Sequence, residues 1–455
     1  IKAVLALDPE KGALEYQEHW HSWKEVASVV STIEALLDEF GVGEGAQIGV
    51  LLRNRPAHVA AVLQIIASRR CVVSLNPFQH ANKIAQDLAG LKLPVLIADA
   101  CDWEVEEIRE SARQAGSLGI ALLSEGELSA SLQPGFDVAP DPATHAEALS
   151  DICILMLTSG TTGPAKRIKL PYANFARALF DAAHYESRKG GELQLKEAAT
   201  LLSTPLVHIG GMYAAILSMM TGRPLVIQEK FNVEQWSRAV ARHRPKSTML
   251  PPTAVRMILD AKVPAEMLSS LLAIRTGSSP LDPAMAEAFE NTYGVPLLDT
   301  YGATEFAGAV AGWTLRDYKQ YGKDKRGSVG RAQPGCELRV IDPETFEPMP
   351  AGTVGLLEVR SAQIDGDSWV RTTDLAELDA DGFLYIRGRA DDAIIRGGFK
   401  VLPREVEKAF CEHPSVADVC VVGVPDERLG AVPVAVIELK GGAQGVTVDE
   451  LMGFV

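Results

Sequence analysis

Short apolar runs separated by helix-like segments fill the N-terminal third of the chain and restrict its fold more than any other feature. The runs lie at 46–52, 71–75, 94–98 and 119–123, and a helix-like stretch at 57–68 separates the first two. Apolar runs of this length that are connected by helices are typical of a parallel sheet buried on both faces. The pattern therefore predicts a layered α/β architecture for this region.

One helix start is marked clearly in the sequence. Ser22 and Glu25 have the spacing of a capping box, in which each side chain bonds to the backbone of the other residue. An amphipathic run follows and continues to Gly41, which is a typical stop signal. We therefore expect a helix between these points.

The texture of the sequence changes after Pro334. Short strands are predicted at 337–341, 354–360 and 383–387, bounded by Gly, Pro and Asp turns, as in a small β-barrel or a meander. Helix and strand signals alternate again after Gly388. We therefore predict a mixed α/β fold with two domains. The large N-terminal domain, residues 1–387, combines layered α/β subdomains with the small β-barrel, and the small C-terminal α/β domain spans residues 388–455.

The composition excludes several classes of protein. The chain has 455 residues, of which 47% are hydrophobic, so it is not a disordered polypeptide. Its formal net charge of −15 is opposite to the basic surface that binds nucleic acid. No apolar run approaches the roughly 20 residues that span a bilayer. The six cysteines are scattered, without a C-x-x-C pair, so a reducing, cytoplasmic location is expected.

One loop follows a predicted strand at 152–157 and is unusually rich in glycine and hydroxyl groups. It begins at Thr158 and ends at Lys166, and its other candidate phosphate-binding residues are Ser159, Gly160, Thr161, Thr162 and Gly163. Glycines let backbone N–H groups approach phosphate oxygens, while hydroxyls and lysine add donors and charge. The loop is not a Walker A motif, because Ala165 precedes Lys166 and Arg167 follows it. A polar surface turn explains the loop equally well when it is considered alone.

Two further segments carry side chains suited to a nucleotide. The segment 299–305 follows an apolar strand and contains Tyr301, which can stack on a base, and Glu305, which can hold a hard cation. Further along, the Asp374 carboxylate can accept both hydroxyls of a ribose, and Arg389 can donate to the same sugar. Taken singly, such residues are more often a buried tyrosine beside a surface glutamate, or part of a solvated turn.

The order of these segments resembles one known family. The sequence reads TSGTTG at 158–163, YGATE at 301–305 and GRADD at 388–392. With this combination the chain resembles the adenylate-forming superfamily of acyl-CoA synthetases, non-ribosomal-peptide adenylation domains and luciferases, over nearly its whole length. The resemblance implies a large AMP-binding domain followed by a small, mobile C-terminal domain.

The resemblance implies nucleotide-binding roles for residues of the large domain. The loop from Thr158 to Lys166 would close over the ATP phosphates, and Glu305 would bind Mg²⁺. Thr304 would contact a phosphate, and Tyr301 would pack on the adenine. The predicted adenine site is completed by Asp299, which matches the residue that reads the amino group, and by Gly277, Ser278, Ser279 and Gly302.

Other implied roles concern the acid, the ribose and the thiol. His208 matches the family's histidine near the reacting carboxylate, although a lone histidine in an apolar run is more often a core group. Asp374 and Arg389 would hold the ribose. Asp391 matches the hinge residue about which the C-terminal domain swings. The residues that would line the pantetheine tunnel are Gly397 and Gly398.

The implied reaction has two steps and uses ATP, Mg²⁺ and coenzyme A. A carboxylate attacks the α-phosphorus of ATP to give an acyl-adenylate and pyrophosphate, and the coenzyme A thiol then attacks the acyl carbon and expels AMP. The protein contributes mainly positioning and charge neutralisation. The resemblance therefore identifies the chain as an acid–thiol ligase, an AMP-forming acyl-CoA synthetase.

Three departures from the family pattern stand out. The phosphate loop ends Ala165-Lys166-Arg167 where the family usually has Pro-Lys-Gly, which puts its closed geometry in doubt, and Thr373 takes the place of a glycine. The family's C-terminal catalytic lysine lies beyond residue 455, so no residue here is assigned that role. We expect the native protein to extend by several tens of residues, on the order of what completes a small α/β unit.

The sequence restricts the acid substrate only in part. Residues 209–214 contain no carboxylate to pair with a substrate ammonium, which disfavours amino acids. Small residues near 302–309 leave room for an aromatic or medium-chain fatty acid, and Met212, Tyr213 and Phe306 are candidates for an apolar slot. The expected partner is thus a small-molecule carboxylic acid, and a homodimer remains open. Two alternatives also remain: an acyl-AMP ligase that loads a carrier protein, and a nucleotide-binding relative without turnover.

Overall fold

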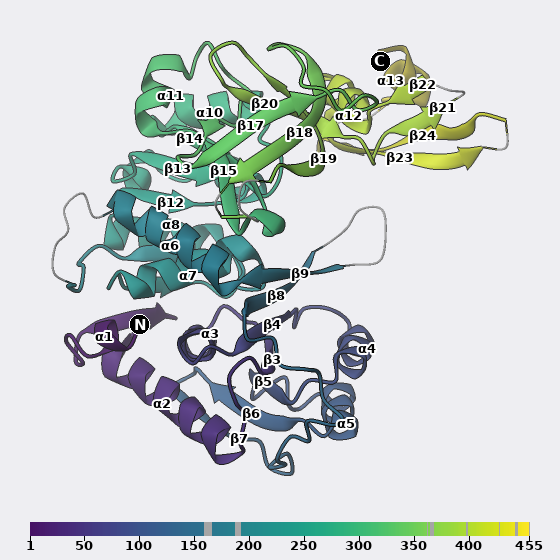
Figure 1. The fold of residues 1–455 in the computed structure, drawn as a ribbon. Coiled ribbons are helices and arrows are strands. Elements are labelled where there is room, and N and C mark those ends of the chain that lie inside the picture. The colour runs from purple at the N-terminus through teal and green to yellow at the C-terminus, as the bar shows by residue number, and fades with distance from the viewer. Residues whose placement is uncertain are drawn as a thin grey trace. The chain divides into compact units, whose positions relative to one another are not determined.

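The computed structural model describes residues 1–158, 166–186, 193–361, 363–364, 368–396, 399–426, 428–441 and 445–454 (Figure 1). These residues form two compact units. The first consists mainly of Ile1–Ser159 and Ala165–Gly327, and the second mainly of Ser328–Ser361 and Asp367–Val455. Both units contain helices and strands, so the predicted mixed α/β class is confirmed. None of the helices in the described ranges has the length and hydrophobicity needed to cross a bilayer.

A seven-stranded sheet forms the N-terminal part of the first unit. Its strand order is β7-β6-β5-β3-β4-β8-β9, and the five inner strands are parallel, whereas β7 and β9 run antiparallel to their neighbours. The strands are β3 (Gln47–Leu51), β4 (Cys71–Leu75), β5 (Val95–Asp99), β6 (Leu118–Leu123), β7 (Ser129–Leu132), β8 (Ile152–Thr158) and β9 (Lys166–Pro171). The predicted parallel sheet is therefore confirmed.

Helices cover both faces of this sheet (Figure 1). One face packs against α2 (Trp23–Glu39) and α3 (Pro56–Ala67), in a core that contains Ile33, Val50 and Ile97. The other face packs against α4 (Ala81–Leu91) and α5 (Glu106–Ala115), in a core that contains Leu88, Leu96 and Trp103. Each fully buried apolar side chain of this kind contributes about 1.5–3 kcal/mol. Both layers therefore stabilise the sheet.

The start of α2 has the predicted capping box. The Ser22 side chain accepts from the backbone N–H of Glu25 at 3.2 Å, and the Glu25 carboxylate accepts from the backbone N–H of Ser22 at 2.7 Å. After α2 ends, Gly41 adopts a φ of +69°, in the left-handed region that favours glycine. Both predicted helix signals are confirmed.

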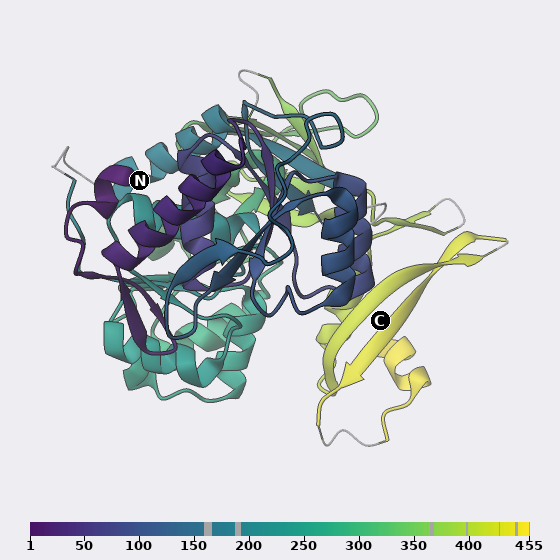
Figure 2. The same ribbon diagram turned by 90° about the horizontal axis from the view of Figure 1, so that it is seen from below.

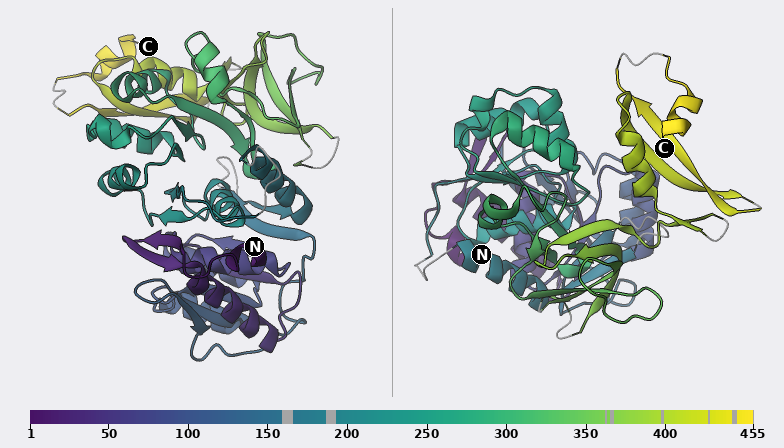
Figure 3. Two further views of the ribbon diagram at one scale, coloured as in Figure 1. Left: turned by 90° about the vertical axis from the view of Figure 1, so that its left-hand side faces the viewer. Right: turned by 90° about the horizontal axis from the view of Figure 1, so that it is seen from above.

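A smaller sheet joins distant parts of the chain in the order β10-β11-β1-β2. Figure 3 shows the N-terminal hairpin of this sheet in purple beside the teal strands. Its elements and the helices near it are α1 (Lys2–Leu5), β1 (Gly12–Tyr16), β2 (His19–Ser22), α6 (Tyr172–Glu186), β10 (Thr200–Leu202), α7 (Ile209–Met220) and β11 (Leu225–Ile227). β10 leads into the segment that carries His208.

A third sheet carries the second part of the first unit. β12 (Ser247–Met249), β13 (Ala273–Thr276) and β14 (Leu297–Ala303) are parallel, and β15 (Gly308–Gly312) returns antiparallel to β14. Trp236, Ile274 and Phe289 belong to its buried core. The other elements are α8 (Val233–His243), α9 (Pro252–Asp260), η1 (Ala265–Leu268), α10 (Pro283–Tyr293), η2 (Thr304–Phe306) and α11 (Leu315–Tyr321). Parallel strands end at the same edge of a sheet, so the turns after β13 and β14 are neighbours.

The second unit contains two antiparallel sheets. The first is a meander in which β17, β18, β19 and β20 pair in chain order, so of the predicted barrel and meander the described strands show the meander. The second has the order β22-β21-β24-β23, and its long β23–β24 hairpin is seen in yellow in Figure 2. The predicted domain boundary at 387/388 falls within β20 and remains a prediction. The elements are β16 (Arg331–Ala332), β17 (Cys336–Ile341), β18 (Val354–Ser361), β19 (Val370–Leu378), β20 (Leu384–Arg389), β21 (Ile394–Arg396), β22 (Phe399–Val401), α12 (Pro403–Cys411), β23 (Val416–Asp426), β24 (Gly430–Leu439) and α13 (Val448–Phe454).

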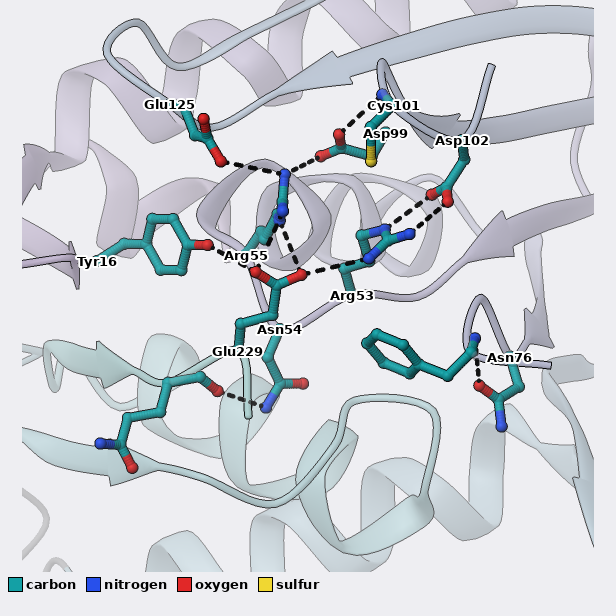
Figure 4. A network of polar contacts seen from close by, with 12 residues as sticks. Tyr16, Arg53, Asn54, Arg55, Asn76, Asp99, Cys101, Asp102, Glu125 and Glu229 are labelled. Atoms are coloured by element: carbon teal, nitrogen blue, oxygen red, sulfur yellow. Dashed lines mark hydrogen bonds and ion pairs between the residues drawn. The ribbon is translucent and has the colours of Figure 1, made fainter. Parts of the chain in front are cut away.

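A cluster of ion pairs connects the sheets of the first unit (Figure 4). Arg53 donates to both carboxylate oxygens of Asp102 at 3.0 and 2.6 Å, and it also contacts Glu229 at 3.3 Å. Arg55 donates to both oxygens of Glu229, each at 3.1 Å, and to Asp99 at 3.2 Å. Buried charges are tolerated only when they are paired in this way. The cluster therefore fixes β3 and β5 against the chain that leaves β11.

Glu229 lies at the centre of this cluster. Burial alone would raise the pKa of its carboxyl group, but hydrogen bonds from Arg55 and Tyr16 and the charges of Arg55 and Arg53 outweigh that effect, so the pKa lies below its usual value. A carboxyl group whose pKa is lowered by folding stabilises the native state at neutral pH. That contribution is lost as the pH falls through the folded-state pKa.

We predict that Glu229→Gln destabilises the protein in a pH-dependent manner. At pH 7 the variant should lose about 3 kcal/mol of unfolding free energy, because both arginines lose a charged partner. The loss should shrink as the pH falls below about 4.3, because the wild-type carboxyl then becomes protonated, first in the unfolded state and at lower pH in the folded state. Thermal melting across this range measures the effect.

Glu125→Gln provides the control for this measurement. The Glu125 side chain is 59% exposed, and its carboxylate oxygen lies 3.6 Å from Arg55, which is a longer contact than those of Glu229. Its replacement should change the unfolding free energy by less than about 1 kcal/mol. A Glu229→Gln deficit of the same size at every pH would contradict the charge-based explanation.

Candidate active site

The turns that follow β13 and β14 bring several predicted residues together. Thr276 is the register partner of Asp299, and its hydroxyl donates to Asp299 Oδ1 at 3.0 Å. The backbone N–H of Thr300 donates to the same oxygen, also at 3.0 Å. These bonds fix the Asp299 carboxylate at the edge of the sheet. The sequence assigns neither threonine a role, because Thr276 lies outside the motifs and Thr300, although within the segment 299–305, acts through its backbone N–H.

The Asp299 carboxyl group has an unusual protonation equilibrium. Only 8% of the residue is exposed, and burial raises the pKa of the carboxyl group to about 6. The hydrogen bonds from Thr276 and Thr300 oppose this shift but are weaker. Asp299 is therefore ionised at neutral pH and becomes protonated only slightly below it.

The turn after β13 requires the small residue that the sequence places there. A β-carbon on Gly277 would lie 2.8 Å from Thr300 Oγ1, which itself donates to the carbonyl oxygen of Thr276 at 2.7 Å. Ser278 follows with a φ of +72°, a left-handed conformation that is uncommon for a residue with a side chain. Ser278 and Ser279 are exposed. The turn is thus a strained, exposed segment beside Asp299, as is common at functional sites.

The β14–β15 hairpin presents the other residues of the YGATE segment. The register shifts between Tyr301 and Gly302, and a β-carbon on Gly302 would overlap Gly308 O. Tyr301 is half-buried, and its ring centroid lies 6.4 Å from that of the buried Phe306. Thr304 and Glu305 lie in the short helical turn η2, where Thr304 is half-buried. The Glu305 side chain is exposed.

No described residues form a cluster of three or more His, Cys, Asp or Glu side chains that could hold a metal ion by itself. Glu305 offers one carboxylate, which suits Mg²⁺ when phosphates and water supply the remaining ligands. The residues present therefore fit a cation that is shared with a bound phosphate chain. They do not resemble an all-protein metal cage.

The strand β9, which begins at Lys166, contacts this region. Thr158 and Lys166 are register partners at the end of the β8–β9 hairpin, and β9 contacts η2. Within the connecting loop, the predicted residues Ser159, Gly160, Thr161, Thr162 and Gly163 lie outside the described residues. The strand that follows the predicted phosphate loop thus contacts the turn that carries Glu305.

Arg167 explains one departure from the family pattern. Its side chain donates to the carbonyl oxygen of Ser74 at 3.0 Å and pairs with Asp87 of α4. Glycine at this position could make neither contact. Arg167 therefore attaches β9 to β4 and α4, and the departure has a structural role in this chain.

His208 occupies the start of α7. Its backbone is extended, with φ −103° and ψ 148°, and its N–H donates to the carbonyl oxygen of Pro205 at 3.0 Å. The side chain is exposed, yet neighbouring protein atoms desolvate the ring enough to lower its pKa. His208 is therefore neutral at pH 7. A β-carbon built on Gly210, two residues on, would lie 3.8 Å from Met249 Cε, so the first turn of α7 lies near the end of β12.

The second unit holds the residues predicted for the ribose and the hinge. Asp374 and Arg389 are cross-strand partners in β19 and β20. Arg389 donates to both oxygens of Asp391, each at 2.9 Å, and to Thr373 Oγ1 at 2.7 Å. Thr373, the other departure within the motifs, therefore supports Arg389. Gly397 and Gly398 lie outside the described residues.

We predict that Gly302→Ala destabilises the β14–β15 hairpin. The new β-carbon would overlap Gly308 O and lie 2.7 Å from Ala309 Cα, so the strands would have to separate. Denaturant unfolding should show a loss of about 1–3 kcal/mol. Unchanged stability would mean that this close approach is not required.

Gly90→Ala is the matched control. Gly90 is an exposed residue of α4, and a β-carbon there would meet no atom within 4 Å. Because alanine is favoured over glycine in helices, this variant should gain up to about 1 kcal/mol.

The chain is similar to several CoA ligases. It is 33% identical over 328 residues to 4-coumarate–CoA ligase-like 5 of Oryza sativa subsp. japonica. This match covers 70% of this chain but only 58% of the relative, so the chain spans less than two thirds of that protein's length. It is 28% identical over 457 residues to indoleacetate–CoA ligase of Aromatoleum aromaticum, which covers 96% and 87% of the two chains.

Solved structures show the same fold. The complex of o-succinylbenzoate coenzyme A synthetase from Bacillus subtilis with ATP and magnesium ion matches with a TM-score of 0.80 at 23% identity, and the match covers 100% of this chain and 91% of that chain. The AMP-binding enzyme family matches residues 2–365, and the AMP-binding enzyme C-terminal domain matches residues 405–455. The resemblance noted in the sequence is confirmed: the chain belongs to the AMP-binding enzyme family.

Proposed function

We propose that this protein is an acid–CoA ligase that forms an acyl-adenylate from a carboxylic acid and ATP and then transfers the acyl group to coenzyme A. AMP and pyrophosphate are released. One observation carries the proposal: the Gly277 turn lies beside Asp299 and Thr300, and η2, which carries Glu305, contacts β9, the strand that begins at Lys166. Membership of the AMP-binding enzyme family supports it.

In this proposal the first unit binds the base and the phosphates of ATP. The ionised Asp299 accepts from the adenine amino group, and the ring of Tyr301 packs on the base. The strained turn made by Gly277, Ser278 and Ser279 lies against the other side of the base, and Gly302 allows the close approach of β14 and β15 beside it. Thr304, Lys166 and the loop that begins at Thr158 bind the phosphates, where lysine supplies charge and the hydroxyls supply donors. Glu305 holds Mg²⁺, which when bound neutralises charge on the phosphates.

The acid binds at the start of α7. The first N–H groups of a helix have no partner within the helix and the N-terminus is the positive end of the helix dipole, and both features favour a carboxylate. The neutral ring of His208 can donate one hydrogen bond to that carboxylate without forming an ion pair that would hold it back from reaction. His208 therefore orients the nucleophilic oxygen.

The second unit contributes the sugar contacts. Asp374 accepts from the ribose hydroxyls and Arg389 donates to the same sugar. Asp391, two residues beyond Arg389, serves as the hinge between adenylation and thioester formation. The Gly397-Gly398 segment lines the channel for the thiol, where the lack of side chains leaves a narrow passage.

An aromatic acid is the substrate class that the observations support best. The relatives described above are named for coumarate and indoleacetate, and residues 209–214 offer no carboxylate for a substrate ammonium. A medium-chain fatty acid is the second choice, because the small residues near 302–309 would leave room for it as well.

A panel of carboxylic acids tests the function. AMP release should require both an acid and ATP, and its full rate should require free coenzyme A. A preference for a carrier protein as acceptor would identify an acyl-AMP ligase instead. Failure of every acid to support pyrophosphate exchange would identify a nucleotide-binding protein without turnover.

We predict that Glu305→Gln abolishes adenylate formation without unfolding the protein. The change removes one charged oxygen ligand but conserves volume, so pyrophosphate exchange should fall at least about 100-fold while the melting temperature stays unchanged. Glu287→Gln is the control, because Glu287 is an exposed carboxylate that contacts Arg326 at 3.5 Å. Near wild-type exchange by Glu305→Gln would show that another group holds the metal.

We also predict that Asp299 makes ATP binding pH-dependent. With a pKa of about 6, the carboxylate is mostly ionised at neutral pH and mostly protonated below pH 6. Between about pH 7.5 and about pH 5.5 the ATP affinity of the wild type should fall about 4-fold relative to that of Asp299→Asn, because only the ionised form accepts fully. Isothermal calorimetry on both proteins gives the ratio of the wild-type ATP affinity to that of Asp299→Asn. Protonation of ATP itself affects both proteins equally, so it cancels in this ratio. A constant ratio would exclude Asp299 as the titrating group.

A further inference from the structure

Asn54 joins three parts of the first unit through one side-chain amide. It lies between β3 and α3 with 2% of its surface exposed. Its Nδ2 donates to the carbonyl oxygens of Thr204 at 3.0 Å and Gln228 at 3.1 Å, and its Oδ1 accepts from the backbone N–H of Leu206 at 2.7 Å. Figure 4 shows Asn54 within the ion-pair cluster, directed toward the chain after β11.

The chemistry of the three partners requires an amide. The two carbonyl groups can only accept and the N–H of Leu206 can only donate, so the orientation of the Asn54 amide follows from its partners. Aspartate has no N–H to donate, and alanine would leave three backbone groups unpaired in a buried place. Asparagine is therefore the side chain that satisfies all three groups at once.

The segment that Asn54 holds leads directly to His208. Thr204 and Leu206 bond to Asn54, and the carbonyl oxygen of Val207 accepts from Ser74 Oγ at 3.3 Å. Asn54 follows β3 and Ser74 lies in β4, two adjacent strands of the seven-stranded sheet. The backbone immediately before His208 is thus tied to the sheet at three residues.

The anchor is itself held rigidly. Arg53 and Arg55, on either side of Asn54, both contact Glu229, which follows Gln228 in the chain. The two arginines thus limit movement of the Asn54 backbone relative to the end of β11. Any displacement of Asn54 would have to break charged contacts on both sides.

We propose that Asn54 is a positioning residue for the acid-binding step, because it determines where the backbone places His208. This inference rests on the proposed function, in which His208 contacts the reacting carboxylate. Asn54 itself touches no substrate. The sequence does not mark it, because its three partners are 150, 152 and 174 residues away.

Hydrogen exchange of the full chain tests the structural part independently of activity. In Asn54→Ala and in the more conservative Asn54→Asp, amides of residues 204–212 should exchange faster than in the wild type, because their opening becomes easier. Gln47→Leu is the matched control. Gln47, in the strand β3 that precedes Asn54, is a buried amide that donates to the backbone carbonyl of Glu147 at 2.8 Å, so its loss should leave residues 204–212 unchanged. Unchanged exchange of residues 204–212 in both Asn54 variants would overturn the proposal.

Kinetics then test whether Asn54 acts through His208. Misplacing a substrate-orienting group by about 1 Å costs about 100-fold, so acid-dependent pyrophosphate exchange should fall toward this extent, with KM for the acid raised and KM for ATP little changed. Asn54→Ala combined with His208→Ala should be no slower than His208→Ala alone. If the rate losses of the two single variants multiply in the double variant, or if KM rises equally for the acid and for ATP, Asn54 has only a structural role and the proposal is overturned. Absence of acid-dependent exchange in the wild type would refute the proposed function, while hydrogen exchange would still decide whether Asn54 holds the segment.

Discussion

The parallel register of β13 and β14 determines the candidate site. Because Thr276, the last residue of β13, pairs with Asp299, the Gly277 turn lies beside Thr300, directly before the YGATE segment. A shift of one residue would direct Asp299 to the other face of the sheet and separate it from Thr276. Each of the other features depends on this register: the buried carboxylate, the strained Ser278, and the η2 turn beside β9.

The sequence predicted what short segments encode. The capping box of Ser22 and Glu25, the buried parallel strands and the three motifs all depend on neighbours in the chain, and the structure shows the strands and the cap where they were expected. The roles of the motif residues stay predictions. Asn54 could not be identified in this way, because its meaning comes from contacts with distant backbone groups and no local pattern records them.

Departures from a family pattern are informative once their contacts are known. The sequence alone shows Arg167 and Thr373 as mismatches, of which the first puts the closed geometry of the phosphate loop in doubt and the second is expected to be tolerated. The structure shows Arg167 paired with Asp87 and bonded to Ser74, and Thr373 accepting from Arg389. Both substitutions therefore replace conformational freedom with a specific contact.

The ion-pair cluster around Asn54 follows from a need for geometry more than for stability. Apolar residues of similar volume often stabilise a protein as well as a buried ion pair does, so the cluster is weak evidence of extra stability. Two arginines here share three carboxylates, those of Asp99, Asp102 and Glu229, and each bond has a defined direction. Apolar packing would allow β3, β5 and β11 to slide by fractions of an ångström. Under the proposed function His208 orients one carboxylate oxygen, so its backbone must not slide, and directional bonds supply that restriction.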